Sequence, residues 1–424
     1  METRETLNDA EELVYRVCKR SFLSLWSYAN PQGEDGKELC DILVVCEPHV
    51  IILSVKDIKL TNSGREEVDW ARWRRKAIAA SSRQLYGAET FLRTASHVIR
   101  KDGTSGLPLS SNAEWRFHRV AVALGSQGKV PLEFGDFGRG FVHVFDERSF
   151  TIILQELNTV ADFVSYLASK ECVYESGVAT VFDGAEEDLL ALYLHQGRKF
   201  PEGPDVIVVG TDMWDALSRR DEFLRRKEAD RESYVWDRLI EEMCKIKPDD
   251  HTEAGPTLTE TELALRVMAR ETRFGRRVLG KAYREFLLSI KKNRSRMAQS
   301  LSPGVAYVFL HVAHGEDRES CEAELEARCF IARGTIPECM TVVGICTEEW
   351  RLGAGCHSYL LYLHMPTWTA DDQSCMEETK RRLGYFRTPI WTRLHEDEYP
   401  VSQAAAHHNV VEMSGHPDHP VEPS

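Results

Sequence analysis

An acid and a lysine stand at the mouth of a strongly apolar hairpin predicted over residues 38–56. Asp41 opens the first strand and Lys56 closes the second, and the residues between them are mostly Ile, Leu and Val. If the chain turns at Pro48-His49, antiparallel register places Asp41 opposite Lys56 on the same face. Both strands are nearly continuous in apolar residues, which predicts cover on both faces. The pair is therefore either a structural ion pair at a strand end or a reactive site.

The elements around this pair have the order found in one group of nucleases. A helix predicted over residues 7–28 carries Glu11 and Glu12, and a second helix, predicted to begin near Asp69, carries Gln84. A helix bearing Glu, a strand starting with Asp, a strand ending in (Asp/Glu)-x-Lys and a further helix resemble the PD-(D/E)XK nuclease superfamily. Within it, the chain is similar to the nuclease-related domain (NERD) group. The resemblance covers roughly the first 145 residues.

The resemblance implies metal-dependent hydrolysis of phosphodiester bonds in DNA. Asp41 and the helix residue Glu12 would hold Mg²⁺ or Mn²⁺, with the carbonyl of Val55 as a further ligand. Lys56 would orient the attacking water and offset the developing negative charge. Gln84 stands where some members of the superfamily place a glutamine that orients the substrate. Because many members act on foreign nucleic acid, the resemblance also implies a role in bacterial antiviral defence.

The chain departs from the family pattern at Ser54, which stands where the second acidic ligand belongs. Magnesium prefers hard anionic oxygens, so a hydroxyl is a poor substitute. The site would recover if Glu12 or Glu38 supplied the missing carboxylate. The alternative is a catalytically inactive nuclease-like protein that binds nucleic acid without cutting it.

Two segments are basic although the chain carries a net charge of -14. Residues 65–101 hold nine Lys or Arg against four Asp or Glu, and residues 270–296 hold ten against two. Clustered cations matter more for a nucleic-acid partner than the total charge. The predicted nucleic-acid contacts are Arg72, Arg74, Arg75, Lys76, Arg273, Arg276, Arg277 and Lys281. The alternative reading is that both segments are amphipathic helices whose arginines are merely solvated.

The chain of 424 residues is long enough for two or three domains. We predict an α/β nuclease-like domain over residues 1–147 and a mainly helical domain over 148–299, with helices at 151–171, 186–195, 232–244 and 260–292. Residues 300–402 are predicted to form an α+β module with strands at 305–312, 327–333, 340–346 and 358–365 and a helix at 369–383. The Pro- and His-rich residues 403–424 are predicted to be disordered.

Composition and residue spacing indicate the compartment and the kind of partner that suit the chain. No segment approaches the roughly 20 apolar residues of a membrane span, the first residues lack a signal-peptide core, and the eleven cysteines show no Cys-x-x-Cys spacing. These features predict reduced thiols in a cytoplasmic protein. After residue 300 the chain holds nineteen acidic against nine basic residues, which fits a protein partner better than DNA. A third candidate function is therefore a protein-interaction or sensor subunit. Because nucleases that cut both strands often pair two active sites, a homodimer stays open.

Overall fold

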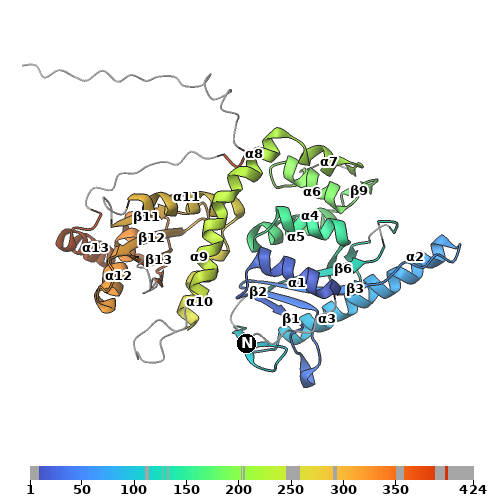
Figure 1. Ribbon diagram of the computed structural model, residues 1–424, viewed down its shortest axis with the longest axis horizontal. Helices are drawn as coiled ribbons and strands as arrows, with labels where there is room; N and C mark the ends of the chain where they lie inside the picture. The colour runs from blue at the N-terminus through green and yellow to red at the C-terminus, as the bar shows by residue number, and fades with distance from the viewer. Residues whose placement is uncertain are drawn as a thin grey trace, which may run out of the picture.

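The chain folds into a mixed α/β structure in which two β-sheets lie on opposite sides of a column of helices (Figure 1). The computed structural model describes residues 9–109, 114–126, 128–130, 133–201, 203, 206–244, 258–289, 294–349, 358–386 and 397–399. Within this part of the chain, no helix is long and apolar enough to cross a membrane. The predicted disordered tail, 403–424, lies outside the described residues.

The N-terminal sheet has six strands in the order β1-β2-β3-β6-β8-β7. Its strands are β1 Ser27–Ala29, β2 Ile42–Cys46, β3 His49–Asp57, β6 Arg116–Leu124, β7 Gly135–Asp136 and β8 Phe141–Phe145. β3 lies antiparallel to β2 and parallel to β6, and β6 lies parallel to β8. Helices α1 (Asp9–Phe22) and α4 (Glu147–Glu156) cover one face, and α3 (Ala80–Leu92) covers the other (Figure 1). The apolar runs of the central strands are thus buried on both faces, as predicted.

The β2–β3 hairpin turns one residue earlier than predicted, which shifts the pairing of the two strands by two residues. Cys46 pairs with His49, so the turn consists of Glu47 and Pro48, and the predicted turn at Pro48-His49 is wrong. Because side chains alternate between the faces of a strand, a shift of two residues keeps the predicted face of every side chain. Asp41 therefore lies by register beside Ser54 and diagonally from Lys56.

Two helices flanking the hairpin also differ from their predicted bounds. The first helix ends at Phe22, and Tyr28, predicted to be helical, lies in β1 and pairs with Leu43. The helix predicted from near Asp69 consists of α2 (Glu66–Arg74), one π-helical turn (Arg75–Ala79) and α3. The apolar residues before residue 125 and over 140–145 form β6 and β8.

The middle of the chain is mainly helical. Its helices are α4, α5 Val160–Glu175, α6 Glu186–His195, α7 Met213–Ser218, α8 Asp221–Ala229, α9 Tyr234–Cys244, α10 Leu258–Ala269 and α11 Arg273–Ser289. The single helices predicted at 151–171 and 260–292 are each two helices, and Thr159 caps the start of α5 by accepting from the Asp162 N–H. Strand β10 (Val206–Val209) pairs in parallel with β9 (Ala179–Phe182). The strand β9 was not predicted.

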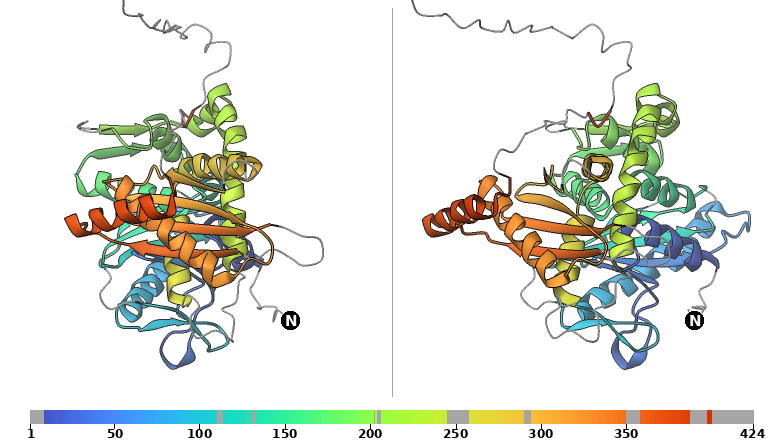
Figure 2. Two further views of the ribbon diagram at one scale, coloured as in Figure 1. Left: turned by 90° about the vertical axis from the view of Figure 1, so that its left-hand side faces the viewer. Right: turned by 60° about the vertical axis from the view of Figure 1, so that its left-hand side comes forward.

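The C-terminal sheet has the order β11-β12-β13-β14, with strands Ser295–Gln299, Val305–Val312, Thr341–Glu348 and Ser358–His364. The strand predicted at 327–333 is wrong, because these residues belong to α12 (Arg318–Thr335). Short apolar runs do not distinguish a strand from a buried helix turn. α12 covers the outer face and α13 (Ala370–Leu383) packs against α12 (Figure 2), while Trp236 of α9 packs against Tyr307 and Phe309 on the inner face.

Candidate active site

Asp41 and Lys56 meet where strands β2 and β3 diverge beyond their paired residues. The Asp41 side chain is almost completely buried, and its Oδ2 accepts a hydrogen bond of 2.6 Å from the backbone N–H of Val55. Lys56 Nζ lies 3.5 Å from the same oxygen, and 29% of the Lys56 side chain is exposed. The backbone therefore fixes the carboxylate, while the ammonium group stays accessible. This arrangement leaves Lys56 free to contact a ligand, unlike the two partners of a closed, buried ion pair.

Glu38 adds a second carboxylate to this site. Partial burial raises the pKa of Glu38, and the negative charges of Asp41 and Glu11 raise it further, whereas Lys56 opposes the shift. A carboxylate whose charge raises the pKa of a second one lies close enough to repel it. Glu38 and Asp41 thus share one region of space beside a single ammonium group.

The helix glutamate whose charge acts on Glu38 is Glu11, whereas Glu12, the predicted metal ligand, pairs with Arg16. Glu12 lies on the outer side of α1, where it pairs with Arg16 at 2.6 Å. Glu11 is three residues before the buried Val14 and seven before the buried Cys18, so it shares their helix face. The apolar spacing in the sequence contains this signal, and it favours Glu11.

Ser54 and Gln84 lie close together, and their side chains are hydrogen-bonded to each other. The Ser54 side chain is completely buried, and its Oγ donates to Gln84 Oε1 at 2.8 Å and also lies 3.1 Å from Ser81 Oγ on α3. The hydroxyl at the position of the missing acid is therefore used to dock α3 onto the sheet. This pairing also engages the amide oxygen of the predicted substrate-orienting glutamine.

The residues present fit a cation held by two carboxylates. Among the described residues there is no cluster of three or more His, Cys, Asp or Glu side chains arranged around a metal position. Mg²⁺, however, is commonly held by one or two carboxylates together with waters and substrate phosphates. Asp41 and Glu38 match this donor set, because a cation would relieve the repulsion that raises the pKa of Glu38. Beside them, Asn30 donates its N–H to the Asp41 carbonyl, and its buried Oδ1 has no hydrogen-bond partner in the described structure.

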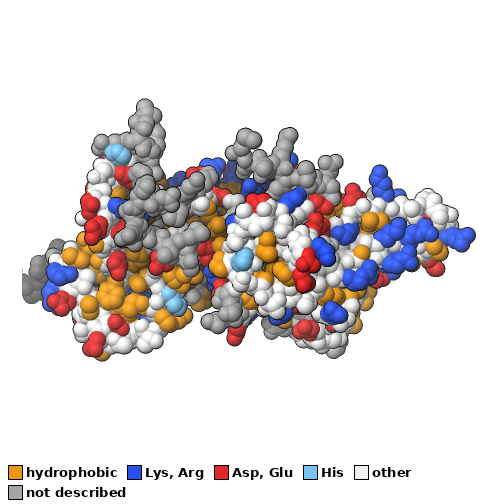
Figure 3. Space-filling model, turned by 90° about the horizontal axis from the view of Figure 1, so that it is seen from below, with side chains coloured by type: hydrophobic (Ala, Val, Ile, Leu, Met, Phe, Trp, Pro, Cys, Tyr) orange, Lys and Arg blue, Asp and Glu red, His pale blue; other side chains and the backbone are white. Residues whose placement is uncertain are grey.

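The predicted basic helix after the hairpin presents an exposed cationic surface. Arg72, Arg75 and Lys76 are exposed, whereas Arg74 is half-buried and pairs with Glu133 at 2.6 Å. Trp73 of the same helix is buried, and its indole N–H donates to the Ile58 carbonyl at 2.7 Å. Lys and Arg side chains gather at the end of the molecule where α2 projects (Figure 3). We call Arg72 of α2, together with Arg75 and Lys76 of the π-helical turn that continues it, the α2 basic stripe.

The second predicted basic surface, on α11, is wrong for three of its four residues. Arg273, Arg276 and Arg277 are buried at 1–2% exposure. Arg273 and Arg276 both pair with Asp237, at 2.7 and 2.8 Å, and Arg277 pairs with Asp230 at 3.2 Å. The fourth residue, Lys281, is half-buried. The arginines hold α11 to the neighbouring helices and are too deeply buried to contact phosphates.

No protein-family model, curated protein or solved structure matches the chain. Its functional interpretation therefore depends on the geometry of the site.

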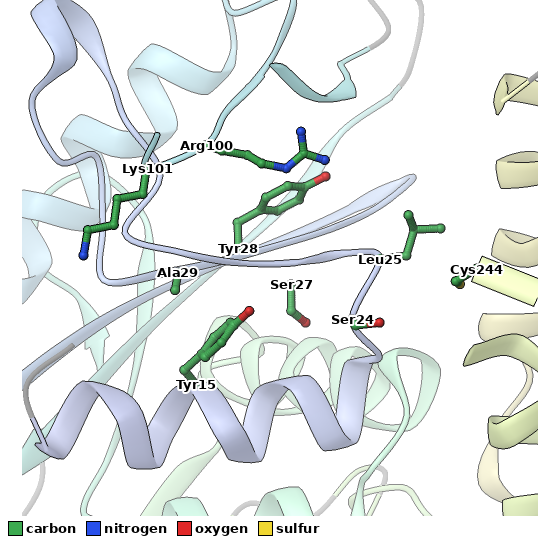
Figure 4. A pocket seen from close by; sticks show the side chains of 9 residues that line it. All are labelled: Tyr15, Ser24, Leu25, Ser27, Tyr28, Ala29, Arg100, Lys101 and Cys244. Atoms are coloured by element: carbon green, nitrogen blue, oxygen red, sulfur yellow. The ribbon is translucent and has the colours of Figure 1, made fainter. Parts of the chain in front are cut away.

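A cavity of about 290 Å³ lies beside the edge strand β1, close to the site. Its lining includes Tyr15 of α1, Tyr28 of β1, Arg100 and Lys101. Arg100 lies over the Tyr28 ring, 5.7 Å from its centroid, while the Lys101 side chain points away from both (Figure 4). These residues come from segments far apart in the sequence, so no local pattern predicts the cavity.

Proposed function

We propose that the protein is a divalent-metal-dependent nuclease that hydrolyses phosphodiester bonds of DNA. The observation that carries this proposal is the buried Asp41 carboxylate, shared between the Val55 N–H and the accessible Lys56 ammonium group, with Glu38 beside it. The surrounding order of α1, the β2–β3 hairpin, α3 and the parallel strand β6 supports the resemblance to the PD-(D/E)XK superfamily.

The chain's residues have distinct tasks in this reaction. Asp41 and Glu38 would hold the cation, which, when bound, supplies Lewis-acid activation of the phosphate and of water. The Val55 N–H points at Asp41, and the N–H and C=O of one strand residue point to the same side, so the Val55 carbonyl is directed to the site as well. Lys56 would stabilise the negative charge that develops on the phosphate oxygens while water displaces the sugar oxygen. Its flexible stem and compact charge suit that task.

Cleavage assays with and without metal test the proposal. We expect the purified protein to cut duplex or single-stranded DNA with Mg²⁺ or Mn²⁺ and to stop when a chelator is added, and RNA should be assayed in parallel. Asp41→Asn keeps an oxygen for the Val55 hydrogen bond but removes the charge, so we expect it to abolish cutting without unfolding the protein. Asp183→Asn, at an exposed position, is the matched control. Cutting that persists in the chelator, or in Asp41→Asn, would contradict the proposal.

A second candidate function is favoured by the position of Ser54. Its hydroxyl is completely buried and donates to Gln84, so that strand position offers no acid and no accessible oxygen to a cation. The corresponding function is sequence-independent nucleic-acid binding without cleavage. Binding of DNA in the chelator, with no cutting on any substrate in either metal, would support it over the nuclease.

Both candidate functions require a nucleic-acid surface, and the exposed α2 basic stripe is our candidate for it. We expect Arg72→Gln/Arg75→Gln/Lys76→Gln to weaken DNA binding about tenfold or more at low salt. We also expect the slope of log affinity against log salt to fall by about 2–3, since each lost phosphate contact removes about 0.9 from B-DNA slopes. Fluorescence anisotropy over a salt series measures both quantities.

The matched control for the stripe lies on α13. Lys380→Gln/Arg381→Gln/Arg382→Gln makes the same charge change in the C-terminal module. If this control weakens DNA binding as much as the stripe variant does, the effect reflects net charge alone and the stripe is not the interface.

A further inference from the structure

Three arginines from distant parts of the helical region converge on a short acidic segment near the end of the chain. Arg198 follows α6, Arg226 lies on α8 and Arg277 lies on α11. The Arg226 and Arg277 side chains are each 1% exposed, and the Arg198 side chain is 18% exposed. The segment that they contact is Asp397–Tyr399, which lies near α8 in Figure 1. We call these three arginines the arginine recess.

The three arginines contact different chemical groups of the segment, namely a carboxylate, backbone carbonyls and an aromatic ring. Arg198 Nε donates to Glu398 Oε1 at 2.6 Å, and Arg226 lies 3.9 Å from the same oxygen. Arg277 donates to the Asp397 carbonyl at 2.5 Å and to the Glu398 carbonyl at 3.3 Å. The Arg226 guanidinium lies 5.4 Å from the centroid of the Tyr399 ring. The recess thus contacts a carboxylate, two consecutive carbonyls and an aromatic face, which together define a short peptide.

Glu398 adds a further carboxylate to ion pairs that already exist in the recess. Each arginine pairs with an acid of the helical region, as shown by the pairs Arg198–Asp162 at 2.9 Å, Arg226–Glu156 at 2.7 Å and Arg277–Asp230 at 3.2 Å. Lys227 adds a fourth cation, 2.9 Å from Glu156. Arg198 and Arg226 lie 2.6 and 3.9 Å from Glu398 Oε1 in addition to their own acids. Hydrogen bonds from guanidinium groups to carboxylates are among the strong ones, so the recess favours an anionic occupant.

The segment is held by these contacts and by little burial of its own. Asp397 is exposed, and Glu398 and Tyr399 are only half-buried. The Tyr399 hydroxyl is buried without a hydrogen-bond partner in the described structure, so the recess accommodates the ring and does not use the hydroxyl. Contacts that bury so little of the segment suit a ligand that can dissociate. A rigid part of the core would bury much more surface.

We propose that the arginine recess is a peptide-binding site whose resident ligand is the chain's own Asp397–Tyr399 and which opens to accept a second acidic peptide carrying Glu followed by an aromatic residue. The resident segment competes at the high effective concentration of a tethered ligand, about millimolar for a short linker. An incoming peptide therefore binds appreciably only when the resident segment is released. This site is independent of the proposed nuclease function, because its contacts involve none of the residues around Asp41.

Peptide binding in trans tests the proposal on the full chain. The probe is a fluorescent peptide with the sequence of residues 395–401, measured by anisotropy. We expect Glu398→Ala/Tyr399→Ala, which disables the resident segment, to bind the probe at least tenfold more tightly than the wild-type protein. The control Glu378→Ala, at an exposed position of α13, should behave as the wild type. A probe with Gln in place of its second Glu should lose binding, and one with Phe in place of Tyr should keep it.

A second pair of variants separates loss of the site from loss of the fold. In the background of the disabled segment, Arg198→Lys keeps the charge beside Asp162 but loses the planar donor group, and we expect at least tenfold weaker probe binding with an unchanged melting temperature. No probe binding to Glu398→Ala/Tyr399→Ala would overturn the proposal. Equal binding by the wild type and this variant would overturn it as well, because the segment would then not occupy the site.

Discussion

Replacing Lys56 with methionine should lower the rate of DNA cleavage about 10²–10³-fold, the usual cost of removing one group that stabilises charge in a transition state. Methionine has a similar length and no charge, so the substitution removes the ammonium group and little packing. The Asp41 carboxylate would keep its hydrogen bond from the Val55 N–H, which does not depend on Lys56. The effect should therefore appear in kcat, with metal binding changed much less. Single-turnover cleavage at saturating metal measures it.

The stability of Lys56→Met should remain close to that of the wild type. Asp41 is buried but keeps the hydrogen bond from the Val55 N–H, and Lys56 is 29% exposed with its nitrogen 3.5 Å away, so we expect a cost of about 1 kcal/mol, below the 3–5 kcal/mol of a fully buried pair. Lys19→Met, at an exposed position of α1, is the control for loss of a surface charge. A Lys56→Met protein that cuts at the wild-type rate would remove Lys56 from the chemistry. A large loss of stability would instead make the pair structural.

The sequence located the candidate site because its signals are local. Alternation along a strand keeps Asp41 and Lys56 on one face for any even shift of register, and the two-residue error in register therefore left this relation intact. The choice between Glu11 and Glu12 was also local, since only Glu11 shares the face of Val14 and Cys18. What the sequence could not supply is the direction of the Ser54 hydroxyl, which depends on how α3 packs on the sheet.

The sequence misassigned features that depend on contacts between distant segments. A cationic helix face has the same pattern whether water or buried acids surround it, and the acid that pairs with Arg276 lies 39 residues earlier in the chain. The arginine recess is a stronger case, because Arg198 and Glu398 are 200 residues apart. In α12 the ambiguity was one of period, since its apolar residues formed a run short enough to suit either a strand or a helix.

The burial of α11 leads to a prediction opposite to that made for an exposed basic helix. Arg276→Gln should lower the free energy of unfolding by about 3–5 kcal/mol, the range for breaking a buried ion pair by removing one partner. Arg276 is 1% exposed, pairs with Asp237 at 2.8 Å and donates from Nε to the Glu271 carbonyl at 3.1 Å. Urea denaturation followed by circular dichroism measures the change. At temperatures where the variant is folded, its affinity for DNA should equal that of the wild type.

A neighbouring residue on the same helix provides the matched control. Arg284 is half-exposed and pairs with Glu232 at 3.0 Å on the surface, so Arg284→Gln should cost no more than about 1 kcal/mol. At acidic pH, the difference in the free energy of unfolding between Arg276→Gln and the wild type should become smaller. Burial alone would raise the pKa of Asp237, but Arg276 and Arg273 hold it below its usual value. Because the pKa of Asp237 is lower in the folded than in the unfolded protein, the ionised carboxylate stabilises the fold at pH values above the unfolded pKa, near 4. This stabilisation is lost as the pH falls through the pKa of the folded protein. If Arg276→Gln unfolds no more easily than Arg284→Gln while its DNA affinity falls, α11 is a nucleic-acid surface after all.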